Sequence, residues 1–85
     1  MSMVQELIAA IMSVEREIDQ QIAALTKYRG ELDGVSQSVN TALAGSTTQY
    51  ADDMIRQLEQ TKTQVSRTIA GMQNAKQKLN VVRRI

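Results

Sequence analysis

The residues of this chain that could do chemistry are a carboxylate group near its start and a basic group near its end. Glu15, Glu17 and Asp19 fall within five residues, and paired carboxylates can act as general acid and base or bind a metal ion. A carboxylate pair at i,i+4 is also ordinary on a helix surface. The chain has no His and no Cys, which are frequent general bases, nucleophiles and metal ligands. We therefore expect no enzyme activity, no cofactor and no metal site.

The basic group consists of Lys76, Lys78, Arg83 and Arg84. Such residues can contact phosphates or lipid headgroups, but the chain has no Trp or Phe for base stacking or membrane insertion. Basic residues also favour a helix C-terminus by interacting with the helix dipole. With a net charge of only +1, we expect neither nucleic-acid binding nor membrane insertion.

The first twelve residues carry Glu6 and no basic residue, which is unlike a secretory signal peptide. No apolar run approaches the roughly 20 residues of a membrane-spanning helix. We expect a protein that is cytoplasmic before any export and that, if exported, uses a route that reads no cleaved signal peptide.

A seven-residue apolar repeat organises the first half of the chain. Written as a heptad abcdefg, the d positions are Val4, Ile11, Ile18, Leu25, Leu32 and Val39. The a positions are Ile8, Glu15, Ile22, Arg29, Ser36 and Leu43, and the g positions are Leu7, Val14, Gln21, Tyr28, Val35 and Ala42. A stripe covering d, a and g predicts a long helix, about residues 3–42, that contacts more than one neighbour.

The second half repeats the pattern and predicts a helix over about residues 47–83. Its d positions are Ala51, Leu58, Val65, Met72 and Leu79, its a positions Ile55, Lys62, Ile69, Lys76 and Arg83, and its g positions Met54, Thr61, Thr68, Ala75 and Val82. The same period in both halves favours left-handed supercoiled packing.

The two segments are separated by a predicted turn at about residues 43–47. Gly45 suits the left-handed conformation of a helix C′ residue, and Ser46 or Thr47 could cap the next helix. Two helices of equal length, each about 60 Å or slightly less, joined by a short turn predict an antiparallel hairpin within one domain, residues 1–85. The competing arrangement is one unbroken helix, against which Gly45 argues.

The charges agree with a hairpin. Residues 1–43 hold six acidic and three basic residues, net −3, and residues 44–85 hold three acidic and seven basic residues, net +4. An acidic helix beside a basic one favours one register. Gly30, Gly34 and Gly71 lie inside the helices, as close backbone crossings, hinges or tolerated weak points.

A partner is expected because a lone hairpin with three apolar rows leaves much of that surface exposed. A four-helix bundle, formed with a second hairpin or another protein's helices, would cover it. The polar a residues must lie at the edge of the seam or face complementary groups on another protein. They favour a heteromeric partner and leave a homodimer open.

The turn also carries a family resemblance. Leu43-Ala44-Gly45, followed by Ser46-Thr47-Thr48-Gln49-Tyr50, resembles the turn of the small Trp-X-Gly helical hairpins, the Esx-like proteins exported by type VII secretion systems. Leu43 stands where that family has Trp, and Tyr50 is about one residue from the usual aromatic position. The family's C-terminal Tyr-x-x-x-Asp/Glu export signal is absent, because no aromatic follows Tyr50.

The Trp-lacking form is similar to the Esx-like helpers encoded beside toxins with an LXG domain. That resemblance implies an adaptor that binds the helical N-terminal domain of a secreted effector, which would supply the export signal. The alternative is a structural coiled-coil or four-helix-bundle component without cargo. Leu43, Gly45, Ser46 and Tyr50 would form the turn motif. The expected partner interface comprises Ile8, Ile11, Ile18, Ile22, Leu25, Leu32, Ile55, Leu58, Val65, Ile69, Met72 and Leu79.

Overall fold

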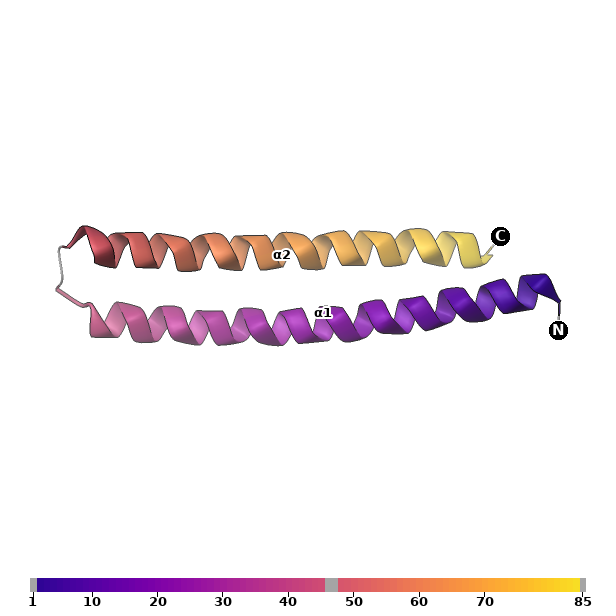
Figure 1. Cartoon of the computed structure of the whole chain (residues 1–85), viewed down its shortest axis with the longest axis horizontal. Helices are drawn as coiled ribbons and strands as arrows, with labels where there is room; N and C mark the ends of the chain where they lie inside the picture. The colour runs from indigo at the N-terminus through magenta and orange to yellow at the C-terminus, as the bar shows by residue number, and fades with distance from the viewer. Residues whose placement is uncertain (1, 46–47, 85) are drawn as a thin grey trace.

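The chain folds as an antiparallel hairpin of two long helices, α1 (Met3–Ala42) and α2 (Gln49–Arg84). The computed structural model describes residues 2–45 and 48–84, and these contain no strand. The hairpin measures 66 × 15 × 13 Å. The start of α1 and the end of α2 lie together at the end opposite the turn (Figure 1). The expected all-α hairpin is therefore confirmed, and the unbroken helix is wrong.

Both helices begin with a side-chain cap. Ser2 and Gln5 form a reciprocal capping box, in which the Ser2 hydroxyl accepts from the Gln5 backbone N–H at 3.1 Å. At the start of α2 the Thr48 hydroxyl accepts from the backbone N–H of Ala51 at 3.3 Å. Thr48 thus supplies the cap that Ser46 or Thr47 was expected to supply, and α2 begins at Gln49 rather than near residue 47.

The turn confirms one expectation about Gly45 and corrects another. Its φ is +81°, in the left-handed region that glycine enters without a Cβ penalty. However, α1 ends with Leu43 as its C-cap, so Gly45 is the second residue beyond the cap rather than the C′ residue. Ala44 holds the C′ place instead.

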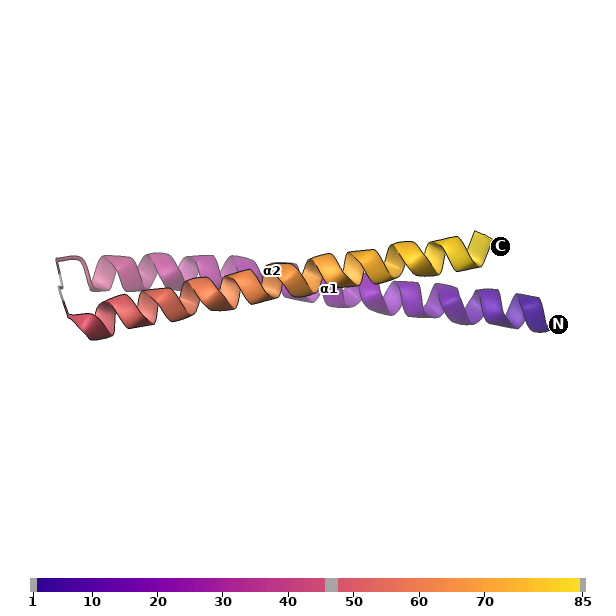
Figure 2. The ribbon, with the colours of Figure 1, turned by 90° about the horizontal axis from the view of Figure 1, so that it is seen from above.

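The core is a narrow seam along the facing sides of the helices, which cross at a shallow angle (Figure 2). Leu32, Val65 and Ile69 form its buried centre. Ile22, Leu25 and Leu58 pack against that centre and are half-buried. The a and d rows therefore meet inside the hairpin, as in supercoiled helix packing.

Two ion pairs show the register of the seam. Lys62 Nζ lies 2.9 Å from Asp33 Oδ1, and Lys76 Nζ lies 2.7 Å from Asp19 Oδ1. Asp19 lies two heptads before Asp33, and Lys76 lies two heptads after Lys62, so both pairs fit the same antiparallel register. In this register Arg84, the last residue of α2, lies opposite the third turn of α1. The first two turns of α1 therefore extend beyond the end of α2 (Figure 1). Met3, Val4 and Leu7 on those turns are exposed.

The three helical glycines make no close approach within the hairpin. A Cβ built on Gly30, Gly34 or Gly71 would meet nothing within 4 Å. The idea of a close backbone crossing is thus wrong for contacts inside the chain. An alanine would fit at each position.

Candidate partner interface

The carboxylates that could have formed a reactive group take part mostly in ion pairs between the helices. Glu15 Oε1 lies 3.0 Å from Arg83 Nε, and Asp19 pairs with Lys76. Glu17 is exposed and makes no ion pair to any described residue. Over the described residues, no three His, Cys, Asp or Glu side chains are grouped as a metal site would need.

The a–d seam divides the remaining surface into two long sides. In an antiparallel pair the e rows of both helices flank the seam on one side and the g rows flank it on the other. Lys62 contacts both Asp33 and Glu59, which are e residues of different helices, so the e rows do share one side. We call this the e side. It comprises Gln5, Met12, Asp19, Thr26, Asp33, Asn40, Asp52, Glu59, Ser66, Gln73 and Asn80.

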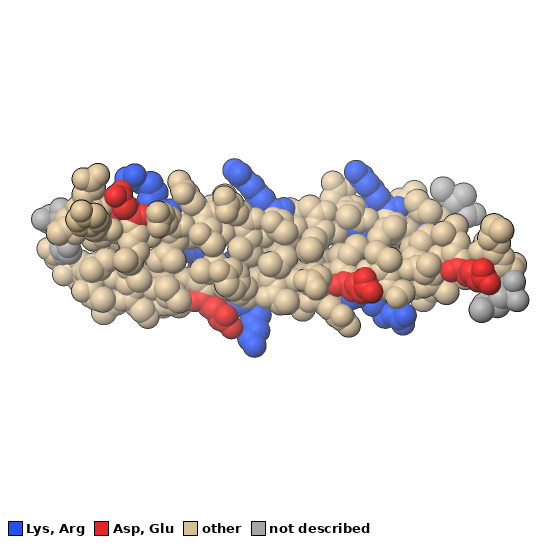
Figure 3. All heavy atoms as spheres, in the orientation of Figure 1, with Lys and Arg blue, Asp and Glu red and all other residues tan. Residues whose placement is uncertain are grey.

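The opposite side, the g side, carries no charge. It comprises Leu7, Val14, Gln21, Tyr28, Val35, Ala42, Met54, Thr61, Thr68, Ala75 and Val82. The large apolar members Leu7, Val14, Tyr28, Val35, Met54 and Val82 are 42–56% exposed. The helix directions in Figure 1 turn the g side toward the viewer, and in the same orientation Figure 3 shows charged side chains mainly along the two long edges, with most of the band between them uncharged. This is an exposed apolar surface of the kind that marks an interaction site.

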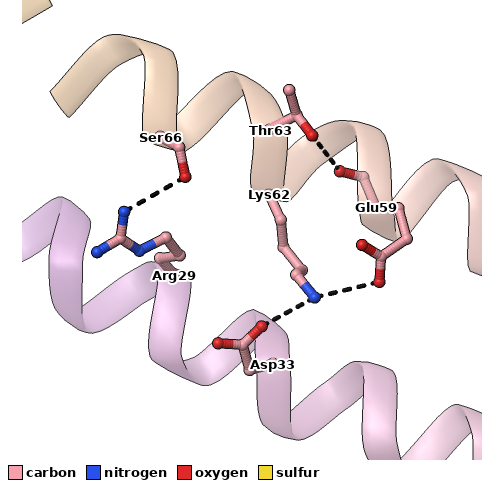
Figure 4. A network of polar contacts seen from close by, with 6 residues as sticks. All are labelled: Arg29, Asp33, Glu59, Lys62, Thr63 and Ser66. Carbon is pink, nitrogen blue, oxygen red and sulfur yellow. Dashed lines mark hydrogen bonds and ion pairs between the residues drawn. The ribbon is translucent and has the colours of Figure 1, made fainter. Parts of the chain in front are cut away.

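The e side is instead held by polar contacts within the chain. Lys62 bridges Asp33 at 2.9 Å and Glu59 at 3.1 Å, and Arg29 donates to the Ser66 hydroxyl at 3.3 Å (Figure 4). The hydrogen bond from Lys62 to Asp33, and then that to Glu59, raises the pKa of Lys62 above its usual 10.5. Lys62 and Lys76 at a therefore reach out of the seam toward acidic groups at e.

Glu15 is the most buried charge in the seam, with a side chain only 10% exposed. Its Oε1 atom and Arg83 Nε are 3.0 Å apart, yet neither atom makes a hydrogen bond, so the contact is an ion pair without hydrogen-bond alignment. Since an unpaired charge in this place would be costly, Arg83 is what makes Glu15 tolerable. The polar a residues Glu15, Lys62, Lys76 and Arg83 all find partners inside the hairpin.

The twelve residues expected at a partner interface all lie on the a and d rows of the seam. Ile11, Leu32, Val65 and Ile69 are buried, and the other eight, Ile8, Ile18, Ile22, Leu25, Ile55, Leu58, Met72 and Leu79, are half-buried. They pack the two helices against each other, and contact between a partner and the half-buried members stays a prediction. Six of the eleven large apolar side chains that remain exposed belong to the g rows. The other five are scattered over other positions: Met3, Val4, Met12, Tyr50 and Val81. The absence of charge from all eleven g positions is the sequence signal that could have singled out the g rows.

The turn motif residues lie at one end of the hairpin. Leu43 is half-buried as the C-cap of α1, and Gly45 provides the left-handed bend. Tyr50 is 85% exposed on the first turn of α2. Ser46 and Thr47 lie outside the described residues.

Comparison with protein-family models, with curated proteins and with solved structures finds no match to this chain. Within residues 2–45 and 48–84, neither helix contains an apolar stretch of the length and hydropathy needed to cross a bilayer.

Proposed function

We propose that this protein is a non-enzymatic interaction module whose g side packs against the helices of another subunit to complete a four-helix bundle. The observation that carries the proposal is the pairing of two opposite features on one hairpin. Three of the four carboxylates of the e side form ion pairs within the chain, whereas the g side exposes six large apolar side chains and no charge. Helix pairs with one exposed apolar face are covered in bundles by a second pair.

The Esx-like resemblance suggests what the module does. The hairpin is an adaptor that binds the helical N-terminal domain of a secreted effector in the cytoplasm and accompanies it to a type VII secretion machine. Leu43 and Gly45 would form the turn motif of such an adaptor, and Tyr50, which is 85% exposed, stands free for recognition. In this arrangement the effector supplies the export signal.

A structural homo-oligomer without cargo is the second candidate. It is favoured by the polar a residues, because Lys62, Lys76 and Arg83 reach acidic partners within their own chain. Groups that are satisfied internally need no complementary charges on a foreign protein. These residues therefore favour a heteromeric partner less than their polarity alone suggests.

The test compares two double variants of α1 as tagged proteins in the native cell. Val14→Glu with Val35→Glu places two charges on the g side, whereas Thr26→Glu with Asn40→Glu places two on the e side as a matched control. We expect the wild-type chain and the control to co-purify with a larger protein that has a helical N-terminal region, and the g-side variant to lose it. Retention of that protein by the g-side variant, with helical content unchanged by circular dichroism, would refute the proposed interface.

A further inference from the structure

The charges that border the g side indicate what can cover it. We propose that a second copy of this chain packs on the g side, with the two-fold axis parallel to the helices, so that both turns lie at the same end and α1 of each copy contacts α2 of the other. The inference rests on the proposed function in that it takes the g side to be the interface. It takes the homo-oligomeric candidate, rather than a foreign effector, as the occupant of this side, and it adds the orientation of that occupant.

The first support is the level at which opposite charges fall. Position c borders g on the outer edge of each helix, and Glu17 of α1 and Lys78 of α2 are both c residues. Glu17 lies two residues before Asp19, and Lys78 two residues after Lys76, in the register shown by the Asp19–Lys76 ion pair. The two residues are therefore at the same level along the hairpin, on opposite outer edges.

Rotation about a two-fold axis parallel to the helices leaves the position of each residue along the helix direction unchanged. It brings Glu17 of one copy directly across from Lys78 of the other, and the reverse pair forms by symmetry. Both side chains are exposed, and neither makes an ion pair with a described residue of its own chain. The arrangement thus pairs two charges that the hairpin leaves free.

The competing face-to-face arrangement puts the turns at opposite ends and α1 against α1. When the g rows of the two antiparallel α1 helices are aligned, Leu7 faces Ala42, and Glu17 comes to within one residue of the level of Glu31. Both glutamates are c residues, so like charges would meet along the same edge. Two acidic helices in contact also forgo the attraction between α1, net −3, and α2, net +4.

The side chains at the proposed contact also fit. With turns at the same end, the g residues of α1 meet those of α2 within one residue of the same level. The pairs are Val14 with Val82, Gln21 with Ala75, Tyr28 with Thr68, Val35 with Thr61, and Ala42 with Met54. The longest side chains thus meet short ones, as close packing requires. The broad side, 66 × 15 Å in outline, is long enough to hold an interface of the roughly 800 Å² per partner typical of a stable complex.

The test begins with the mass of the full chain, measured by sedimentation equilibrium over a range of concentrations. We expect a reversible dimer that Glu17→Lys and Lys78→Glu each weaken roughly tenfold, because each dimer contains two such exposed pairs. An equimolar mixture of the two variants should recover wild-type affinity, since every Lys then faces a Glu. Arg16→Glu, which alters the neighbouring b position away from the g side, is the matched control.

Orientation is read from a spin label on Ala44→Cys, a unique site because the chain has no other cysteine. Labels near each other in the dimer support turns at the same end, whereas a separation near the 66 Å length of the hairpin overturns the arrangement. Failure of the mixed variants to recover affinity overturns it as well.

The outcomes also separate this inference from the proposed function. A chain that stays monomeric, yet binds a helical partner through Val14 and Val35, overturns the second copy and leaves the interaction module standing. If Val14→Glu with Val35→Glu weakens neither the dimer nor a complex with another protein, both the second copy and the proposed g-side interface are overturned.

Discussion

The two sides of the hairpin face the same solvent but differ in the charge of their residues. On the e side, acidic residues such as Asp33 and Asp19 receive the long basic side chains that leave the seam at Lys62 and Lys76. On the g side, no residue is charged, and Tyr28, like five other large apolar side chains, is about half exposed. Intrachain ion pairs thus hold charged residues along one side of the hairpin, whereas the other side is uncharged and exposes apolar side chains.

The greatest loss of stability is expected for a substitution in the seam, and a much smaller one for a substitution on the g side. Ile69→Ala removes a side chain that is only 5% exposed and should destabilise the hairpin by about 2–4 kcal/mol. Val35→Ala, at a residue 47% exposed, should cost the isolated hairpin less than about 1 kcal/mol but weaken association. Thermal melts by circular dichroism at low and high protein concentration measure both effects. Equal losses for the two variants at low concentration would remove the distinction.

A smaller loss of stability is expected when the ion pair between Glu15 and Arg83 is broken. Arg83→Met leaves Glu15 unpaired in a site where its side chain is 10% exposed, and we expect a loss of about 1–2 kcal/mol after allowance for the one-third exposure of Arg83. Replacing both residues, Glu15→Leu with Arg83→Leu, should restore or exceed wild-type stability, because neither charge is then desolvated. A double variant less stable than Arg83→Met in urea titrations would contradict this account of the pair.

The outer back of α1, which belongs to neither side, should tolerate change. Gly30→Ala and Gly34→Ala should each stabilise the hairpin by about 0.5–1 kcal/mol, because a Cβ there meets nothing within 4 Å. Gly45→Ala should destabilise it by about 1 kcal/mol, since its φ is +81°. Dimerisation and partner binding should be unchanged in the Gly30 and Gly34 variants. Weakened association in either would place part of the interface on the outer back.

The smallest effect is a pH dependence that belongs to the e side. Because the pKa of Lys62 in the folded chain is raised above 10.5, its contribution to stability is complete below pH 10.5 and is lost as the pH rises through the folded-state value. The difference in melting temperature between wild type and Lys62→Met should therefore shrink in that range. Asp33→Asn, which removes the largest cause of the shift, should shrink it at all pH values. A difference that is constant with pH would show that the ion pair adds nothing.

Much of the fold could be predicted because its signals are local and periodic. Apolar d residues such as Ile11 and Val65 recur every seven residues, and Gly45 is the obvious break between the two runs. The position of the second cap was harder, since Ser46, Thr47 and Thr48 all carry a hydroxyl that could accept the same backbone N–H. Only backbone geometry distinguishes Thr48, whose hydroxyl is 3.3 Å from the N–H of Ala51.

The candidate site was predicted less well, for a geometric reason. A stripe with three apolar rows does not say which two rows the hairpin uses internally, so the pattern alone does not separate buried residues such as Leu32 from exposed ones such as Val35. The fate of the polar a residues was also hidden, because Lys62 finds Asp33 only across the seam. Comparing the two flanking rows gives the missing signal, since charge is present at e and absent at g.

The most direct test of the uncharged side as an interface is thiol labelling in the native cell, where any natural partner is present. Val35→Cys on the g side and Thr26→Cys on the e side are each the only cysteine of their chain and can be labelled with a membrane-permeable maleimide. If the g side is covered, Val35→Cys reacts much more slowly than Thr26→Cys in the cell, and the two rates converge when the purified chain is diluted. Equal rates for the two cysteines in the cell would contradict the account.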